Sequence, residues 1–162
     1  MPSFSPAGDR APAQDFFQFE ADFVESLRCI PMQVRLKLDT CGVKLKLEHW
    51  HQFRAEDRER LTLLPCTDAA STVAYTAYVQ ALVHRVQGRP ASTLAVDPQP
   101  PWHNGATLPA EVQAQAQALG ATLTAAQWQG LSPLQRFALI KLSRPGHENR
   151  NFYPALGEFG LI

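Results

Sequence analysis

Three cysteines and two histidines are the side chains in this sequence best suited to hold a metal ion: Cys29, Cys41, Cys66, His49 and His51. Metal sites in proteins usually take two ligands from one turn of chain, in spacings such as C-x2-C or H-x3-H, and no pair here has such a spacing. Each cysteine, however, ends a predicted helical segment, which could bring the three sulfurs together. A metal or iron–sulfur site on the cysteines is therefore an alternative to their burial as small apolar side chains.

A cluster of basic side chains is the second candidate. Most of its members flank the junction between a predicted helix and the loop that follows, where their charge could attract an acidic protein surface or an anionic cofactor. The other interpretation is a solvated face whose charges are balanced by Asp39 and Glu48. We predict a partner-binding surface formed by Arg28, Arg35, Lys37, Lys44 and Lys46.

The common signatures of catalysis are absent from the sequence. It contains no G-x-S-x-G, no H-E-x-x-H, no phosphate-binding glycine-rich loop and no dinucleotide fingerprint. We therefore predict a protein that is not an enzyme, with no catalytic residues, no metal and no cofactor. An enzyme acting on a small substrate would need a concave pocket with converging polar groups, which a sequence does not display.

Composition narrows the class of partner. The chain has 162 residues and a formal net charge of zero, whereas nucleic-acid-binding domains usually carry a basic excess. No apolar run approaches the length of a membrane span, and residues 1–15 lack the apolar core of a signal peptide. Three cysteines, an odd number, suit a reducing compartment. The sequence therefore predicts a cytoplasmic protein with neither nucleic acid nor membrane as partner.

One stretch of the sequence recurs at a constant offset, without a gap. Residues 30–64 and 108–142 share the pattern P-x2-V-x7-G-x2-L-x4-W-x2-(F/L)-x4-R-x2-L-x2-L. Two helical patterns of similar period would align their leucines by chance, but not also a proline, a glycine, a tryptophan and an arginine in order. The pattern predicts an internal duplication.

The duplicated arginines, Arg58 and Arg136, have two interpretations. They are either paired cationic contacts for an anionic ligand or parts of the framework. In the second interpretation, which we favour, each arginine packs its stem beside the tryptophan of its own repeat and binds carbonyls at a helix end.

The predicted fold is all-α, with about seven helices in two pseudo-symmetric helix–loop–helix–helix repeats. A long central helix over residues 68–87 bridges the repeats, followed by a Pro-rich connection at residues 89–106. A short β-bridge between residues 43–47 and residues 121–123 is a further expectation. We predict one domain, residues 16–162, after a flexible leader, residues 1–15.

Several helix ends have local signals. Pro31 suits the first turn of a helix and Gly42 its C-terminal cap. Thr124 with Gln127 forms a predicted capping box. Aromatic residues at helical spacing predict a further short helix over residues 18–28.

Two segments carry a resemblance to a known family. The first, Phe17 to Trp50, reads FQFEADFVESLRCIPMQVRLKLDTCGVKLKLEHW, and the second, Trp128 to Leu142, reads WQGLSPLQRFALIKL. Both resemble the nitrate-reductase-associated protein family, known mainly from cyanobacteria. Together they cover about a third of the chain, and the first is long and rich in rare residue types.

The resemblance implies a small soluble accessory protein that supports the activity or maturation of assimilatory nitrate reductase. The implied partner is nitrate reductase itself or the machinery that matures its molybdenum cofactor. The family offers no catalytic or ligand-binding residues to transfer to this sequence.

Overall fold

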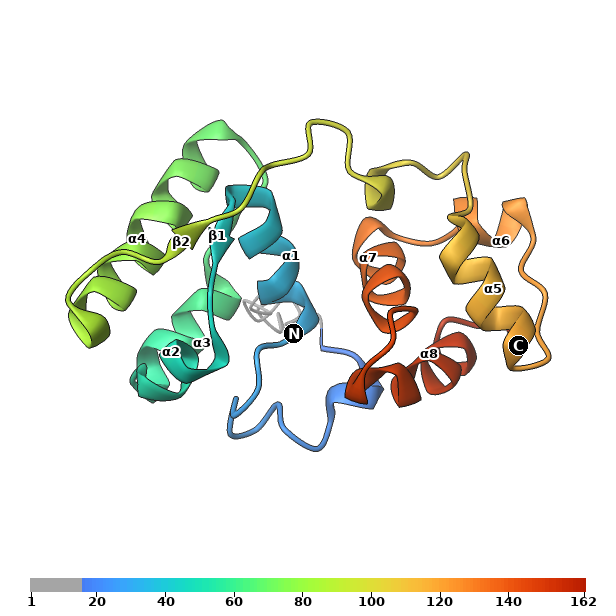
Figure 1. The fold of residues 1–162 in the computed structure, drawn as a ribbon, viewed down its shortest axis with the longest axis horizontal. Helices are drawn as coiled ribbons and strands as arrows, with labels where there is room; N and C mark the ends of the chain where they lie inside the picture. Colours follow the sequence, from blue (N-terminus) through green and yellow to red (C-terminus); the bar gives the residue numbers. More distant parts are fainter. Residues whose placement is uncertain (1–15) are drawn as a thin grey trace, which may run out of the picture.

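The computed structural model describes residues 16–162, so the predicted leader, residues 1–15, lies outside the described part of the chain. Within residues 16–162 the fold is all-α, as predicted, with eight α-helices, short 3-10 helices and one two-stranded antiparallel sheet. Figure 1 shows two lobes side by side, an N-terminal lobe with α1 to α4 and a C-terminal lobe with α5 to α8. No helix of this part of the chain is long and apolar enough to cross a bilayer.

Each lobe is built from short elements. The N-terminal lobe contains α1 (Met32–Cys41), β1 (Val43–Lys44), α2 (Leu47–Gln52), α3 (Ala55–Leu63), α4 (Ala69–Gln87) and β2 (Ser92–Thr93). The C-terminal lobe contains α5 (Ala110–Ala118), α6 (Ala125–Gln129), α7 (Pro133–Leu142) and α8 (Phe152–Glu158). Three 3-10 helices complete the described residues: η1 (Gln18–Glu20), η2 (Pro101–His103) and η3 (His147–Asn151).

The N-terminal lobe has its own apolar core. The side chains of Trp50 and Tyr75 are almost fully buried in it, and α4, the longest helix, packs against α1, α2 and α3. The helix begins at Asp68, whose carboxylate accepts from the Ser71 N–H at 2.7 Å, and ends at Gly88. Thus α4 follows the first predicted repeat in sequence, but in space it belongs to the N-terminal lobe (Figure 1).

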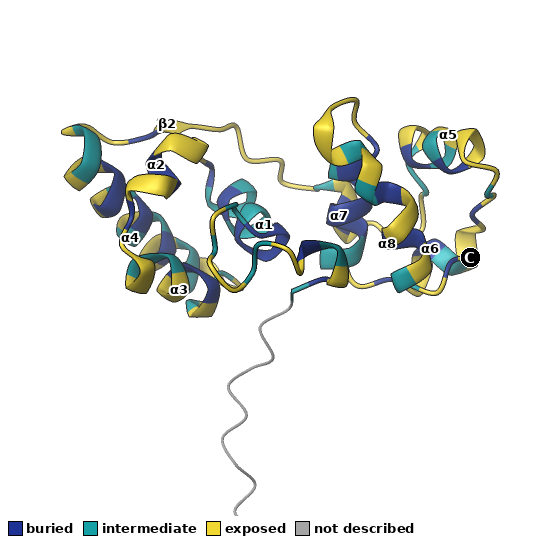
Figure 2. Cartoon of the chain, turned by 90° about the horizontal axis from the view of Figure 1, so that it is seen from below, coloured by how far each residue is buried: buried dark blue, intermediate teal, exposed yellow. Residues whose placement is uncertain are grey.

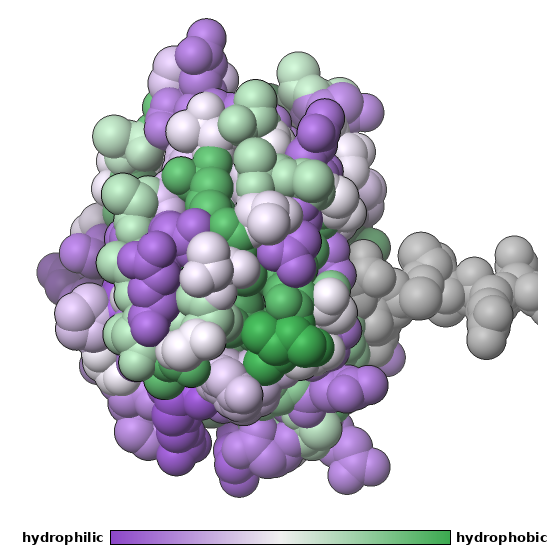
Figure 3. All heavy atoms as spheres, turned by 90° about the vertical axis from the view of Figure 1, so that its right-hand side faces the viewer, coloured by the Kyte–Doolittle hydropathy of each residue, from purple (hydrophilic) through white to green (hydrophobic). Residues whose placement is uncertain are grey.

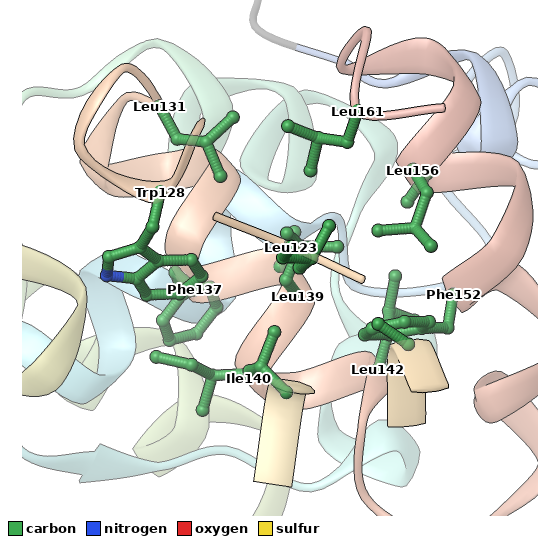
Figure 4. Close-up of a cluster of buried hydrophobic side chains, with 14 of the residues drawn as sticks. Leu123, Trp128, Leu131, Phe137, Leu139, Ile140, Leu142, Phe152, Leu156 and Leu161 are labelled. Atoms are coloured by element: carbon green, nitrogen blue, oxygen red, sulfur yellow. The ribbon is translucent and has the colours of Figure 1, made fainter. Parts of the chain in front are cut away.

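A second core fills the C-terminal lobe (Figure 4). Trp128 packs near Phe137 on one side of this core, whereas Phe152 and Leu156 of α8 lie on the other side. The Pro-rich connection contributes Trp102, whose ring meets Phe137 edge-on at 5.0 Å between centroids. The connection is therefore anchored to the core and is more than a linker.

The two lobes meet where α1 packs against α7 (Figure 2). An ion pair joins these helices, with Lys141 Nζ 2.8 Å from Asp39 Oδ2. The side chains are only 13% and 23% exposed, so solvent screens the pair less than a surface pair. Packing and charge together hold the lobes against each other.

Equivalent elements recur at the offset seen in the sequence. Helices α1, α2 and α3 fall on the same repeat positions as α5, α6 and α7. Gly42 and Gly120 follow the first helix of each set with φ of 74° and 81°, and Trp50 and Trp128 are buried in the two cores. These correspondences agree with an internal duplication, which stays a prediction.

The predicted bridge between residues 43–47 and 121–123 is wrong. Strand β1 pairs instead with β2, in the Pro-rich connection, with Val43 opposite Thr93. The backbone of Leu123 pairs with a side chain and not with a strand. The Gln113 amide donates to the Leu123 carbonyl at 2.8 Å and accepts from the Leu123 N–H at 3.0 Å. The backbone groups are thereby satisfied without a sheet.

The predicted helix over residues 18–28 is also wrong. Only η1 and irregular turns form there, and Leu27 has a left-handed φ of 49°, which no α-helix contains. The side chain of Glu20 holds this segment in place, as described below. The segment makes isolated backbone hydrogen bonds, such as Leu27 N–H to the Phe23 carbonyl, but these do not join into an α-helix, and aromatic spacing alone did not reveal this.

Candidate functional site

A cavity of about 440 Å³ opens where the segment before α1 approaches the C-terminal lobe. Its walls come from this segment, α1, the start of α2, the end of α7 and η3, so both lobes are needed to form it. The volume lies within the range of pockets that bind small molecules. The apolar part of the lining consists of Phe19, Phe23, Ile30, Met32, Leu45, Leu47 and Leu142.

Glu20 positions the wall nearest the N-terminus. One carboxylate oxygen accepts from the Met32 N–H at 2.7 Å and the other from the Phe17 N–H at 3.1 Å. The first of these satisfies an N–H in the first turn of α1, which has no partner within its own helix. Burial raises the pKa of Glu20, although the two backbone N–H groups and Arg35 act in the opposite direction. The side chain is 2% exposed, so it supports the cavity wall and hardly contacts solvent.

Charged side chains gather at the cavity as two ion pairs and an additional arginine. Arg35 Nη1 lies 2.7 Å from Glu148 Oε2, which links α1 to η3 across the lobes. Arg28 and Asp22 lie 3.5 Å apart and are both more than 60% exposed. Arg150 is exposed and forms no ion pair or hydrogen bond with the residues that the structure describes. The cavity therefore combines an apolar wall with guanidinium groups.

The predicted basic cluster is divided by the fold. Arg28 and Arg35 line the cavity, and Lys46 lies between the lining residues Leu45 and Leu47 with its Nζ 3.8 Å from Glu48. The imidazole of His51 in α2 donates to the carbonyl of Arg28 at 2.8 Å, which holds α2 beside this segment. Arg28 and Arg35 therefore line the cavity, and Lys46 is an exposed neighbour of two lining residues.

Lys37 and Lys44 are placed differently. Lys37 Nζ donates to carbonyls at the end of α3, at 3.0 Å to Thr62 and 2.7 Å to Leu64, and lies 5.6 Å from the centroid of the Tyr75 ring. A cation at a helix C-terminus is favourable, so Lys37 belongs to the framework of the N-terminal lobe. Lys44 is exposed on β1, opposite Ser92.

The three cysteines do not form a metal site in the described residues. No group of three His, Cys, Asp or Glu side chains between residues 16 and 162 could hold an ion. Cys29 lines the cavity, whereas Cys66 Sγ donates to the Lys37 carbonyl at 3.7 Å. Burial raises the pKa of both the Cys41 and the Cys66 thiols, as expected for small buried side chains. The geometry gives the iron–sulfur alternative no support.

The duplicated arginines belong to the framework, as we favoured. Arg136 is 8% exposed and donates to the carbonyls of Trp102, Trp128 and Gln129. Arg58 donates to the Leu27 carbonyl at 3.1 Å, as does the Trp50 indole N–H at 2.6 Å. In both lobes the arginine and the indole N–H of the tryptophan donate to carbonyls of an earlier segment of the chain, and Arg136 also binds carbonyls of the Trp128 helix.

The matched family agrees with the resemblance seen in the sequence. Residues 16–159 match the family described as conserved nitrate reductase-associated protein. The chain belongs to this family. A search of curated proteins gave no match, and a search of solved structures also gave none. The match spans both lobes, so the family corresponds to the whole two-lobed unit.

In this member of the nitrate reductase-associated family, the segment that carried the resemblance also builds most of the cavity. Phe17 to Trp50 supplies its lining from η1, the turns after it, α1 and the start of α2. The C-terminal lobe completes the opposite wall with Leu142 and η3. The distinctive part of the sequence and the inter-lobe cavity therefore coincide.

A second surface lies at the far end of the C-terminal lobe. Figure 3 shows apolar residues there among hydrophilic ones, and Leu119 after α5 and the C-terminal Ile162 are 42% and 54% exposed. The inter-lobe cavity, by contrast, combines a concave apolar wall with charged side chains. The inter-lobe cavity is therefore the stronger candidate site.

Sequence reasoning missed the acidic and C-terminal parts of the site. Glu20 resembled one more charge in a mixed segment, and only its two backbone partners reveal its role. Glu148 and Arg150 lie near the C-terminus, outside every motif and predicted site in the sequence. Their spacing from Arg35 along the chain offers no local pattern, so no sequence signal could have paired them.

Proposed function

We propose that this protein is an accessory factor that supports assimilatory nitrate reductase by binding the reductase or the machinery that matures its molybdenum cofactor. The observation that carries the proposal is the family match over residues 16–159. Binding, rather than catalysis, agrees with a site built from an apolar wall and arginines.

The opening of the inter-lobe cavity is the surface that we assign to the partner. Arg28 and Leu47 line the cavity, Lys46 precedes Leu47 in the chain, and all three are largely exposed, Leu47 by 47%. Exposed cations around an apolar patch suit a partner with an acidic rim and an apolar centre, because complementary charge speeds encounter while apolar contact provides affinity.

Complementation of cells that lack this protein tests the proposal. Nitrate reductase activity per amount of reductase polypeptide should be low in such cells and should return with the wild-type chain. Full reductase activity without the protein would contradict the proposal. Measuring the molybdenum cofactor content of the purified reductase would then distinguish a role in cofactor insertion from a role in supporting the mature enzyme.

A further inference from the structure

We infer that the inter-lobe cavity binds a small organic anion with an apolar body, such as an aromatic or alkyl carboxylate, sulfonate or phosphate ester. This inference concerns the isolated chain and does not rest on the proposed association with nitrate reductase. It follows from the size of the cavity, from its apolar wall and from the guanidinium groups at its edge.

The size and position of the cavity suit a small ligand. Its volume of about 440 Å³ is open to solvent and bounded by parts of both lobes, and pockets between structural units commonly bind small molecules. Met32 and Leu142 are buried, whereas Phe19, Phe23 and Ile30 remain partly exposed in the same lining. The fold therefore leaves aromatic and aliphatic surface uncovered inside a concave space, where a ligand with a ring or chain would cover it.

The charged part of the lining favours an anion. Of the three acidic residues, Glu20 directs its carboxylate oxygens at backbone N–H groups and is 2% exposed. Apart from the buried Glu20, the lining carries two carboxylates, Asp22 and Glu148, and three guanidinium groups, those of Arg28, Arg35 and Arg150. Two of these arginines are in ion pairs, so Arg150 is the guanidinium left for a ligand anion.

The arginines also keep free hydrogen-bond donors. A guanidinium carries five N–H donors, and Glu148 contacts Arg35 through Nη1. Arg150 donates to no residue within the described chain, and the Arg28 contact with Asp22, at 3.5 Å, is long and solvent-exposed. Guanidinium groups bind carboxylates, sulfonates and phosphates through paired donors, so these arginines can hold the anionic end of a ligand whose body lies on the apolar wall.

A pair of fluorescent probes tests the inference on the full chain. The anionic probe is 1-anilinonaphthalene-8-sulfonate, and the neutral control is N-phenyl-1-naphthylamine, which has the same rings without the sulfonate. We expect saturable binding of one anionic probe per chain. Arg150→Ala and Arg28→Ala should each weaken that binding about three- to tenfold, as expected for partly exposed charge contacts, and should leave binding of the neutral probe unchanged.

Two further variants separate the cavity from other apolar surfaces. Arg89→Ala removes an exposed arginine that does not line the cavity and should change neither probe. Ile30→Trp fills part of the cavity and should weaken both probes. Circular dichroism confirms the fold of each variant. The inference is overturned if the anionic probe does not bind saturably, if Arg28→Ala and Arg150→Ala behave like Arg89→Ala, or if Ile30→Trp binds both probes as the wild type does.

Discussion

At the scale of single residues, Glu20 is the side chain on which the candidate site most depends. Its carboxylate joins the N–H of Phe17 to the N–H of Met32, and so connects the chain before α1 to the first turn of that helix. Both donors lie in buried residues, where a missing partner is costly. Glu20 therefore holds the segment that forms one wall of the cavity, while its own carboxylate is buried behind that wall.

Glu20→Ala should destabilise the protein by roughly 2–4 kcal/mol, because two buried backbone N–H groups lose their acceptor. Glu20→Gln keeps one amide oxygen and should cost about half as much. Chemical denaturation measures both changes. Glu25→Ala, at an exposed position of the same segment, is the matched control and should change stability by less than about 0.5 kcal/mol. An equal, small effect of Glu20→Ala and Glu25→Ala would contradict this role.

The pH dependence of stability provides a second test of Glu20. Burial raises its pKa above the ordinary value of 4.5, so the folded protein holds this proton more tightly than the unfolded chain does. The resulting stabilisation is complete below pH 4.5 and is lost as pH rises through the folded pKa.

The free energy of unfolding of the wild type minus that of Glu20→Gln should therefore decrease from about pH 4 to pH 7. Denaturation curves of both proteins across this range measure the difference. If the difference grows with pH, the carboxylate is instead stabilised in its charged form by the N–H groups and Arg35.

At the scale of elements, helix ends were the most predictable features, because their signals are local. Gly42 ends α1 in left-handed geometry, and Thr124 and Gln127 form the capping box of α6. Pairing between distant segments was less predictable. The partner of β1 depends on how the Pro-rich connection folds back, and no pattern within Val43–Lys44 identifies Ser92–Thr93 as its partner.

Comparing Gly42→Ala with Gly88→Ala separates the destabilisation caused by backbone strain from that caused by close packing. Both glycines end helices with similar φ, 74° and 77°, so an alanine costs about 1 kcal/mol at either position. A Cβ at Gly42 would also lie 2.8 Å from Val96 Cγ2 and 2.9 Å from the Leu94 carbonyl oxygen, whereas a Cβ at Gly88 meets nothing within 4 Å.

We therefore expect Gly42→Ala to cost at least about 1 kcal/mol more than Gly88→Ala, as is typical of overpacking. Thermal and chemical unfolding of the two variants measure this difference. Equal losses would mean that the chain after β2 does not pack over the end of α1.

At the scale of the whole molecule, the two lobes are joined by α1, α7 and two ion pairs. Of these, Lys141–Asp39 is the better shielded, and Arg35–Glu148 borders the cavity. This arrangement could not be read from the sequence. The duplicated pattern indicated similar halves, but it contained no information about which helix of one half would contact the other.

A double-mutant cycle with Asp39→Asn and Lys141→Met should give a coupling energy of about 1–2 kcal/mol, because the pair is partly buried. The matched control is a cycle with Asp22→Asn and Arg28→Met, whose partners are more than 60% exposed. That cycle should give less than about 0.5 kcal/mol. Similar coupling in both cycles would show that the inter-lobe pair adds nothing beyond a surface contact.

For the candidate site as well, features that depend on local sequence could be predicted, whereas contacts between distant residues could not. The basic residues Arg28, Arg35 and Lys46 were predicted from charge pattern. Arg28 and Arg35 line the cavity, and Lys46 lies between the lining residues Leu45 and Leu47 in the chain. Lys37 was included for the same reason, although its ammonium caps α3. Charge pattern identifies solvent-accessible cations but does not reveal which of them is committed to a helix end.

We propose that the cavity opening contacts nitrate reductase or its cofactor machinery. The most direct test is co-purification with a tagged chain from cells grown on nitrate, followed by mass spectrometry. Arg28→Glu/Lys46→Glu reverses two exposed charges at the opening, and Arg54→Glu/Arg89→Glu reverses two exposed charges elsewhere. We predict that the wild type and the second variant recover the reductase or a molybdenum-cofactor maturation protein, and that the first variant recovers at least about tenfold less. Recovery of neither protein by the wild type, or equal recovery by both variants, would contradict the account.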